Sequence, residues 1–446
     1  MPGGLLTDQY ELNMAASYLR RSMTGKATFS LFVRALPPGR GFLVAAGLAD
    51  CLAFLEDFSF TPDDLSYLRQ ARGYEEETLR AFAGLRFTGD VRAAPEGRVI
   101  FAGEPLLEVT APVAEAQLAE TVLLNHVTFQ TAVAAKAARC VLAAGGARLV
   151  DFAFRRTQGI DASMAVARAS AIAGFAATSN VAAARRYGLA AAGTMAHSFI
   201  EAFGDEQEAF AAFAAYFPGM TTFLVDTYDT GRGVRAAIEV TRRLRLPGPV
   251  GVRLDSGDLA ALARMARTML DEAGLGDARI FASGSLDEYA IAGLVAAGAP
   301  IDAYGVGTKM GVSADAPYLD TAYKLVAYDG RPVMKLSAGK TSAPGAKQVY
   351  RGPGGDVLAL REELPPPGHE PLLVPVMREG KRLSAPEPLA AARRRCHADL
   401  AWLPPAARAL RDPEPVPVRI SEQLKSLQDQ VTRDLRQRTA VRLLQE

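Results

Sequence analysis

The sequence predicts an α/β protein: an irregular βα barrel packed on an N-terminal mixed α/β domain, with a loop-rich C-terminal region that ends in a helix. Three observations predict this fold. From about residue 147, short apolar strands alternate with amphipathic helices, a pattern typical of a parallel sheet covered by helices. The earlier part of the chain mixes strands and helices without that alternation. After residue 340, prolines and loops dominate until a final amphipathic helix.

The length of 446 residues suits two or three domains, or one large barrel with additions. We expect three parts. These are an N-terminal mixed α/β domain over residues 1–120, an α/β barrel over residues 121–340, and a C-terminal region over residues 341–446 that packs on both.

Composition and charge exclude several function classes. With 49% hydrophobic and 22% charged residues, the chain is an ordinary globular protein and not a disordered or fibrous one. Lysines and arginines number 50 and acidic residues 49, which leaves a net charge of +1. No global field therefore directs the protein to nucleic acid or to an anionic membrane, and we expect neither as a partner.

Cysteine usage and apolar patterning bear on the compartment. Cys51, Cys140 and Cys396 lie far apart, an odd and sparse set that suits a reducing compartment. The first residues lack the basic segment and apolar core of a secretion signal. No stretch approaches the ~20 apolar residues of a membrane span. These features predict a cytoplasmic protein.

The elements of the N-terminal part follow from local patterns. Residues 5–19 predict a helix with Leu12, Ala15, Ala16 and Leu19 on one face. The other predicted elements are a strand over 27–37, a helix within 41–58, strands with Pro/Gly turns over 91–113 and a helical stretch over 114–144.

The barrel elements alternate with regular spacing. Predicted strands cover 147–154, 189–195, 221–227, 249–256, 278–284 and 301–307, and predicted helices cover 161–173, 178–187, 198–217, 232–244, 259–273 and 286–297. So many βα units in so short a segment favour a closed barrel over an open sheet.

Beyond the barrel the pattern changes. Residues 322–337 predict a hairpin around Asp329 and Gly330. A proline-rich and loop-rich region over 341–420 leads to a helix over 421–444, with Leu424 and Val431 among its apolar positions.

The polar residues that follow the predicted strands form a consistent set. In a βα barrel, reacting side chains lie at the carboxyl ends of the strands and in the loops that follow. Those positions hold Phe152, Arg155, Arg156, Thr194, His197, Asp226, Asp229, Arg253, Asp255, Asp258, Ser283, Gly284, Gly305, Gly307 and Thr308. Cations, carboxylates, a histidine and glycine-rich turns indicate a site for a phosphorylated, hydroxylated substrate with a divalent metal.

Several of these residues also have a structural interpretation. His197 alone fits a buried histidine bonded to backbone as well as an acid, base or nucleophile, and the neighbouring charges favour the second. Ser198 is a plausible N-cap for the helix that follows His197. Asp255 and Ser256 fit a helix cap, although two carboxylates and an arginine in VRLDSGD exceed what a cap needs.

The remaining motifs are less specific when taken singly. Gly305 and Gly307 in YGVGTKMG fit a tight turn as well as a phosphate loop. Phe152 is more often a core residue than a stacking surface. Arg155 and its neighbour Arg156 are typical of solvated surface pairs.

Taken together and in order, the motifs resemble those of the nicotinate phosphoribosyltransferase family. The matching segments cover roughly residues 5–351: LLTDQYELNM, DFAFRRTQG, GTMAHSF, VDTYDT, VRLDSGDL, IFASGSLDE, YGVGTKMG, YKLV, MKLS and PGAKQVYR. The resemblance implies a type II phosphoribosyltransferase fold and a catalytic barrel in an obligate homodimer. It also implies NAD salvage: nicotinate and phosphoribosyl pyrophosphate react, with Mg²⁺, to give nicotinate mononucleotide and pyrophosphate. ATP, a co-substrate, is hydrolysed through a phosphohistidine.

Carried over residue by residue, the resemblance implies these roles. His197 matches the phosphorylated histidine. Phe152 and Tyr10 resemble the pair that sandwiches the nicotinate ring, with Tyr10 supplied by the partner subunit. The other positions implied are Thr194 and Arg253 in the nicotinate pocket, Arg155 at the ribose phosphate or pyrophosphate, Asp255 at the ribose hydroxyls and Mg²⁺, Gly307 and Thr308 at the 5′-phosphate, and Gly284 and Gly305 in the floor of the site.

One position bears on the choice of base. Nicotinamide relatives hold an aspartate at the position that aligns with Ser179, where it would repel the carboxylate of nicotinate. The absence of that aspartate here favours nicotinate. A nicotinamide enzyme is the closest alternative, and His197 argues against a quinolinate enzyme. A catalytically silent relative, acting as a sensor or structural partner, would typically lack one of His197, Arg155, Arg253 or Asp255, and all four are present.

Overall fold

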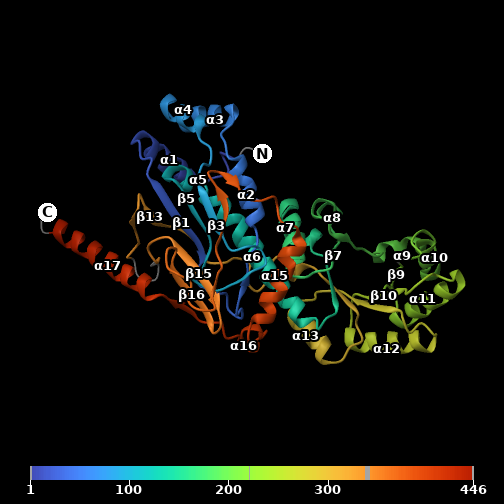
Figure 1. Ribbon diagram of the computed structural model, residues 1–446. Coiled ribbons are helices and arrows are strands. Elements are labelled where there is room, and N and C mark those ends of the chain that lie inside the picture. Colours follow the sequence, from blue (N-terminus) through green and yellow to red (C-terminus); the bar gives the residue numbers. More distant parts are fainter. Residues whose placement is uncertain (1–2, 220, 337–341, 444–446) are drawn as a thin grey trace. The chain divides into compact units, whose positions relative to one another are not determined.

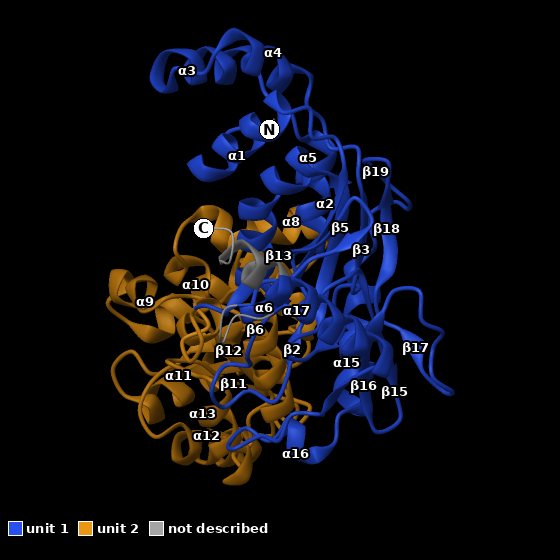
Figure 2. Cartoon of the chain, turned by 90° about the vertical axis from the view of Figure 1, so that its left-hand side faces the viewer, with its two compact units in different colours: residues 1–132, 318–446 blue, residues 133–317 orange. Residues whose placement is uncertain are grey.

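The computed structural model describes residues 3–219, 221–336 and 342–443. The chain forms two compact units (Figure 2). Unit 1 comprises Met1–Ala132 and Tyr318–Glu446, and unit 2 comprises Val133–Pro317. The C-terminal region therefore shares one unit with the N-terminal part of the chain.

A seven-stranded antiparallel sheet organises unit 1, in the order β14-β13-β1-β5-β3-β18-β19. Its strands are β1 (Lys26–Val33), β3 (Asp90–Ala93), β5 (Pro105–Pro112), β13 (Thr321–Tyr328), β14 (Arg331–Pro332), β18 (Val374–Arg378) and β19 (Lys381–Arg382). β1 pairs with β5 on one side and β13 on the other, so segments from both ends of the chain share one core. The predicted hairpin is confirmed, since Tyr328 pairs with Arg331 across Asp329 and Gly330, both with positive φ.

In the first helix of unit 1, the buried face agrees with the prediction better than the first residue does. α1 (Gln9–Arg20) begins four residues later than expected, after Asp8 in extended conformation, and buries Leu12, Ala15 and Ala16. The other helices of the N-terminal segment are α2 (Leu48–Asp57), α3 (Pro62–Arg72), α4 (Glu76–Gly84), α5 (Val113–Leu118) and α6 (Glu120–Ala143). α3 starts with a reciprocal cap between Thr61 and Asp64, which satisfies two backbone donors.

The C-terminal region carries more regular structure than its prolines suggested. A second sheet has the order β17-β15-β16-β20. Its strands are β15 (Lys347–Gly352), β16 (Gly355–Leu360), β17 (Glu370–Pro371) and β20 (Val418–Ile420), and the helices of the C-terminal region are α15 (Leu389–Trp402), α16 (Pro405–Arg408) and α17 (Glu422–Leu443). Two short strands from the N-terminal part of the chain, β2 (Leu43–Val44) and β4 (Val99–Ile100), pair separately. The final helix is confirmed and buries Leu424 and Val431.

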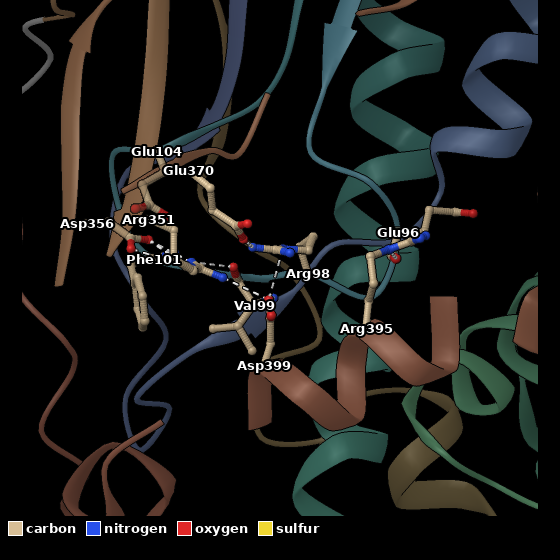
Figure 3. Close-up of polar contacts among 10 residues, drawn as sticks. All are labelled: Glu96, Arg98, Val99, Phe101, Glu104, Arg351, Asp356, Glu370, Arg395 and Asp399. Carbon is tan, nitrogen blue, oxygen red and sulfur yellow. Dashed lines mark hydrogen bonds and ion pairs between the residues drawn. The ribbon is translucent and has the colours of Figure 1, made fainter. Parts of the chain in front are cut away.

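A buried charge network joins the second sheet to α15 (Figure 3). Arg351 on β15 donates from Nη2 to Asp356 Oδ2 at 2.6 Å and from Nη1 to Asp399 Oδ2 at 2.8 Å. Its Cζ lies 4.8 Å from the Trp402 ring centroid and 5.8 Å from that of Phe101. One guanidinium therefore satisfies two buried carboxylates while it stacks against two aromatic rings.

Glu104 is the third carboxylate of this network. Burial raises its pKa well above the ordinary value, and the charge of Asp356 raises it further despite Arg351. Its Oε2 accepts the backbone N–H of Phe101 at 2.8 Å. Burial and the neighbouring Asp356 therefore both favour the neutral form of this carboxyl group.

A seven-stranded parallel sheet organises unit 2, in the order β8-β7-β6-β12-β11-β10-β9. Its strands are β6 (Arg148–Asp151), β7 (Ala177–Thr178), β8 (Ala190–Ala191), β9 (Thr222–Leu224), β10 (Gly251–Leu254), β11 (Arg279–Ala282) and β12 (Ala303–Val306). β8 and β9 form the two edges, so the sheet is a curled half-barrel and not the closed barrel that the spacing favoured. Only two residues of each of β7 and β8 pair, which leaves too little ladder on that side for closure.

Helices follow the strands of unit 2 as expected, with two corrections: the unpredicted strand β7 occupies the start of the helix expected over 178–187, and another predicted helix is divided. The helix predicted over 198–217 is two helices, α9 (His197–Phe203) and α10 (Glu206–Tyr216). Gly204 adopts a left-handed conformation that ends α9, and the Asp205 side chain caps α10. The others are α7 (Ile160–Ala173), α8 (Val181–Tyr187), α11 (Thr230–Leu244), α12 (Leu259–Glu272), α13 (Glu288–Ala296) and α14 (Thr308–Gly311), and Figure 1 shows α12 beside β10.

Across residues 3–219, 221–336 and 342–443, we find no helix with the length and apolar character needed to cross a membrane.

Candidate active site

The carboxyl ends of the unit 2 strands bring several predicted residues together. Parallel strands place all their carboxyl ends at one edge of the sheet, where the following loops can converge. Arg253 on β10 reaches Thr194, in the loop after β8, and Ser283, in the loop after β11. Asp255 and His197 complete the cluster. The structure thus brings together residues from the ends of three strands, β8, β10 and β11, as the sequence predicted.

Arg253 is the centre of this cluster. Its Nε donates to Ser283 Oγ at 2.7 Å, its Nη1 to Thr194 Oγ1 at 3.1 Å, and its Nη2 to Asp255 Oδ1 at 2.6 Å. The side chain is 12% exposed. Since a guanidinium is planar and has five donors, three partners in one plane fix its orientation. A fixed, partly buried cation of this kind can bind an anion without first reorganising.

Asp255 is kept ionised by its neighbours. Burial alone would raise the pKa of this carboxyl group, but the hydrogen bond from Ser283 and the charge of Arg253 outweigh burial and lower it. Ser283 Oγ donates to Asp255 Oδ1 at 2.5 Å. Both of these donors bind Oδ1, so Oδ2 faces the rest of the site.

His197 lies beside the second oxygen of Asp255. Its Nε2 is 3.9 Å from Asp255 Oδ2, and its Nδ1 is 3.1 Å from Thr227 Oγ1. The side chain is 40% exposed, so the structural interpretation, in which a buried histidine is bonded to backbone, does not hold. His197 is also the first residue of α9, with Ala196 at the N-cap position, and the predicted cap at Ser198 was wrong. An accessible imidazole next to a carboxylate can accept a proton or a phosphoryl group.

An aromatic surface adjoins the arginine. The Cζ atom of Arg253 lies 5.3 Å from the ring centroid of Phe152, and Phe281 packs against Phe152 with centroids 5.6 Å apart. Phe152 is only partly buried, so one side of it can receive a planar ring. A flat anionic ligand could thus stack on Phe152 while its charge meets Arg253.

Glycines in the site permit close approaches that a side chain would block. Gly284 has φ +93°, and a Cβ atom there would lie 1.9 Å from the carbonyl oxygen of Asp255. A Cβ atom at Gly305 would lie 2.8 Å from the Phe152 ring. Glycine is therefore required at both positions, by contact with the two residues that shape the site.

The structure places the remaining predicted residues as follows. Arg155, in the short 3₁₀ helix Phe154–Arg156, is exposed, as is Thr308 at the start of α14. Ser179 follows β7, with its backbone N–H bonded to the Asp151 carbonyl at 2.8 Å. Gly307 precedes α14. Tyr10 lies on α1 in unit 1, 48% exposed, and is not among the residues that converge in unit 2.

Three further strand-end carboxylates have structural partners. Asp229 and Asp258 cap α11 and α12 by accepting backbone N–H groups. Asp226 Oδ2 accepts the backbone N–H of Asp255 and the hydroxyl of Ser256, each at 2.8 Å. Asp226 therefore holds the VRLDSG turn in place. Sequence reasoning missed Thr227, although its position directly after Asp226 at a strand end was a usable signal.

The carboxylates of the site could bind a divalent metal only together with other ligands. Among the described residues, no group of three or more His, Cys, Asp or Glu side chains could by itself hold an ion. Mg²⁺ does not need such a group, because it usually keeps several waters and binds one or two carboxylates together with substrate phosphates. Asp255, ionised and with Oδ2 not engaged by Arg253 or Ser283, fits that kind of ligand.

The fold and the cluster define a class: an α/β half-barrel enzyme whose strand ends hold a fixed arginine, a carboxylate and an aromatic surface. Family models for nicotinate phosphoribosyltransferase match along the chain, the N-terminal domain over residues 5–128, the family model over 147–349 and the C-terminal domain over 361–428.

Relatives agree with these matches. The chain is 51% identical over 417 residues to nicotinate phosphoribosyltransferase pncB2 of Mycobacterium tuberculosis, covering 92% of this chain and 89% of that one. It is 45% identical over 378 residues to the nicotinate phosphoribosyltransferase of Bacillus subtilis, covering 80% and 76%. The crystal structure of human nicotinic acid phosphoribosyltransferase superposes with a TM-score of 0.84 at 30% identity, over 95% of this chain and 99% of that one. The chain belongs to the nicotinate phosphoribosyltransferase family.

Proposed function

We propose that the protein joins nicotinate to phosphoribosyl pyrophosphate, forming nicotinate mononucleotide and pyrophosphate in NAD salvage. One observation carries this proposal: Arg253 lies over Phe152 and is locked by Ser283, Thr194 and Asp255. A planar ring with a carboxylate matches that pairing of stacking surface and cation. Family membership, with relatives of that name, supports the same reaction.

The reaction forms one bond and breaks another at the anomeric carbon of the sugar. The ring nitrogen of nicotinate bonds to the anomeric carbon. The bond between that carbon and the pyrophosphate oxygen breaks, and pyrophosphate leaves with the electron pair. Since the sugar becomes positively charged between these events, the protein's task is to align the two reactants and to stabilise the leaving anion. Phe152 and Arg253 would align the base, and Arg155 would bind the phosphates.

Asp255 has two tasks in this scheme. Its lowered pKa keeps it anionic, so it can accept hydrogen bonds from the ribose hydroxyl groups and stabilise positive charge on the sugar. It would also bind Mg²⁺, which supplies charge neutralisation to the departing pyrophosphate. Gly307 and Thr308 would hold the 5′-phosphate, with Gly284 and Gly305 keeping the floor of the site open.

Ser179 supports the choice of nicotinate over nicotinamide. Its side chain is uncharged and partly buried, at the end of β7. An aspartate at this position would repel the carboxylate of nicotinate, whereas the uncharged serine does not. Nicotinamide remains the second candidate base, because a serine hydroxyl can also accept from an amide.

His197 supports coupling to ATP. We infer that its imidazole takes the γ-phosphoryl group of ATP, releasing ADP, and that water later cleaves the phosphohistidine to phosphate. The accessible ring, held through Nδ1 by Thr227, is suited to nucleophilic attack. The added negative charge would lie beside Asp255 and Arg253, where it can order the metal and the arginine for the sugar donor.

Tyr10 supports a homodimer. Its ring is 48% exposed on α1, and it would cover the second face of nicotinate from the partner subunit. Two inactive variants test this: mixed dimers of Tyr10→Ala and Arg155→Ala should regain one intact site in every mixed pair. No recovered activity in the mixture would contradict action across the interface.

A product assay tests the proposed function. Purified protein would be given phosphoribosyl pyrophosphate and Mg²⁺ with either nicotinate or nicotinamide, and the mononucleotide measured. Turnover of nicotinate alone is expected. Equal or better turnover of nicotinamide would refute the argument from Ser179, and turnover of neither would favour a catalytically silent relative.

A further inference from the structure

The loop assigned to the 5′-phosphate and the loop that carries Ser283 and Gly284 are joined by a charged pair that the reaction does not use. The loop after β11 ends at Asp287, which caps α13, and the loop after β12 enters α14 through Gly307 and Thr308. Lys309, the next residue, donates from Nζ to Asp287 Oδ2 at 2.7 Å. The ion pair thus links the start of α14 directly to the start of α13.

Asp287 has both carboxylate oxygens engaged. Its Oδ1 accepts the backbone N–H groups of Tyr289 at 3.1 Å and Ala290 at 2.9 Å. Its Oδ2 is left for Lys309. A single carboxylate therefore fixes the first turn of α13 and anchors α14 to it. The Asp287 side chain is 12% exposed and that of Lys309 is 45% exposed, so the carboxylate end of the pair is shielded while the ammonium end is open to solvent.

A second link joins the same two segments through α6. Lys136 lies 2.7 Å from Glu288 Oε2 and 2.8 Å from Asp315 Oδ1, measured from Nζ. Glu288 is the first residue of α13 and is fully buried, and Asp315 follows α14. Arg139, also on α6, approaches Glu288 Oε1 to 3.0 Å from Nε. The loops after β11 and β12 are consequently held at a fixed spacing by two independent sets of contacts.

Burying these charges is a poor means of stabilising a fold. The desolvation of a buried ion pair offsets most of its attraction, and apolar side chains of similar size often stabilise as well or better. What a fully satisfied charged network supplies is one defined geometry, because removal of any member leaves another charge uncompensated. A defined spacing between loops matters most where one loop must hold a substrate group in a fixed position relative to the rest of the site.

We propose that Lys309 and Asp287, supported by Lys136, are positioning residues that fix the loop proposed to hold the 5′-phosphate relative to the loop that carries Ser283 and Gly284. This inference rests on the proposed function, and it goes beyond it by assigning affinity for the sugar donor to side chains that do not touch it. Lys309 acts through Asp287 and not by binding the phosphate itself.

Three variants test the proposal: Lys309→Ala, Asp287→Asn and the double variant. Asparagine still caps α13, so Asp287→Asn removes the charge and keeps the helix start. We expect each single variant to raise the KM for phosphoribosyl pyrophosphate roughly ten-fold, because small displacements of binding groups are costly. The double variant should be no worse than either single one, since both break the same link. The KM for nicotinate should change by less than about two-fold, and Lys309→Arg should restore most of the loss.

Direct phosphate binding by Lys309 predicts a different pattern. Asp287→Asn would then free the lysine and leave the KM for the sugar donor unchanged or lower, while Lys309→Ala would raise it. That pattern, or an unchanged KM in both single variants, would overturn the proposal. Lys425→Ala is the matched control, because it breaks an exposed lysine–carboxylate pair with Glu422 on α17.

Calorimetric binding of phosphoribosyl pyrophosphate gives the same comparison without turnover. If the unmodified protein binds the sugar donor but forms no product, the proposed function fails while the binding constants of the variants still decide the positioning role. Equal binding by all variants would refute that role on its own.

Discussion

The guanidinium of Arg253 donates from Nη2 to Oδ1 of Asp255, two residues further along the chain, at 2.6 Å. The same Asp255 oxygen accepts from Ser283, and the other Asp255 oxygen faces His197. The cation proposed to bind the base and the anion proposed to serve the sugar are thereby fixed relative to each other. The two proposed binding groups belong to one hydrogen-bonded unit.

Ser283→Ala should move the acid limb of the pH profile to higher pH. The Ser283 hydrogen bond helps to lower the pKa of Asp255, so its loss raises that pKa, and the carboxylate is protonated at a higher pH than in the unmodified protein. The stability that ionised Asp255 contributes would likewise be lost at a higher pH as the solution is acidified. The measurement is kcat/KM against pH. Ser256→Ala is the control, because Ser256 donates to Asp226 and not to Asp255; an equal displacement in both variants would contradict this account.

Thr227→Val should weaken ATP coupling and spare the base site. Valine keeps the shape of threonine but cannot bond to His197 Nδ1, so the imidazole loses its orientation. We expect ADP formation to fall roughly ten-fold, the effect of about one hydrogen bond, with the nicotinate KM unchanged. ADP and nicotinate mononucleotide would be measured together. Unchanged ADP release would show that Thr227 does not orient the ring.

Gly284→Ala should abolish activity, whereas Gly274→Ala should not. Both glycines have positive φ, so alanine strains the backbone at each. Only at Gly284 does the new Cβ also meet a backbone atom, 1.9 Å from the Asp255 carbonyl oxygen; at Gly274 nothing lies within 4 Å. A similar loss of kcat/KM in the two variants would mean that strain, and not displacement of Asp255, is responsible.

Arg351→Met should destabilise the protein without a direct effect on chemistry. The methionine leaves Asp356 and Asp399 buried without their shared cation, at a cost of about 3–5 kcal/mol. The loss should shrink as the pH falls, because burial raises the pKa of Asp399 and protonation of that carboxylate removes an uncompensated charge. Urea denaturation at several pH values provides the measurement. A loss no larger than that of exposed Arg69→Ala would contradict the role given to the network.

The strand ends of unit 2 were predictable because they depend on local patterns. Apolar strands followed by helices fix which residues emerge at the carboxyl edge, and Arg253, Asp255, His197 and Thr194 meet there as expected. The same reasoning overestimated Asp229 and Asp258, since a cap and a ligand look alike in a sequence.

Non-local pairing was not predictable from such patterns. β1 pairs with β13, almost 300 residues further along the chain, and the sequence of neither strand indicates its partner. β7 and β8 contribute only two paired residues each; β7 was not predicted as a strand, and the shortness of β8 is hidden within the longer apolar segment LAAAGTM. The contact of Thr227 with His197 and the link between Lys309 and Asp287 likewise depend on the three-dimensional arrangement of separate loops.

We propose that this cluster couples ATP hydrolysis at His197 to synthesis of nicotinate mononucleotide. The most direct measurement follows ADP and the mononucleotide together in the unmodified protein and in His197→Ala, with nicotinate, phosphoribosyl pyrophosphate, Mg²⁺ and ATP. We expect both products from the unmodified protein, and slow mononucleotide formation without ADP from the variant. Undiminished ADP release by His197→Ala, or no mononucleotide from the unmodified protein, would contradict the account.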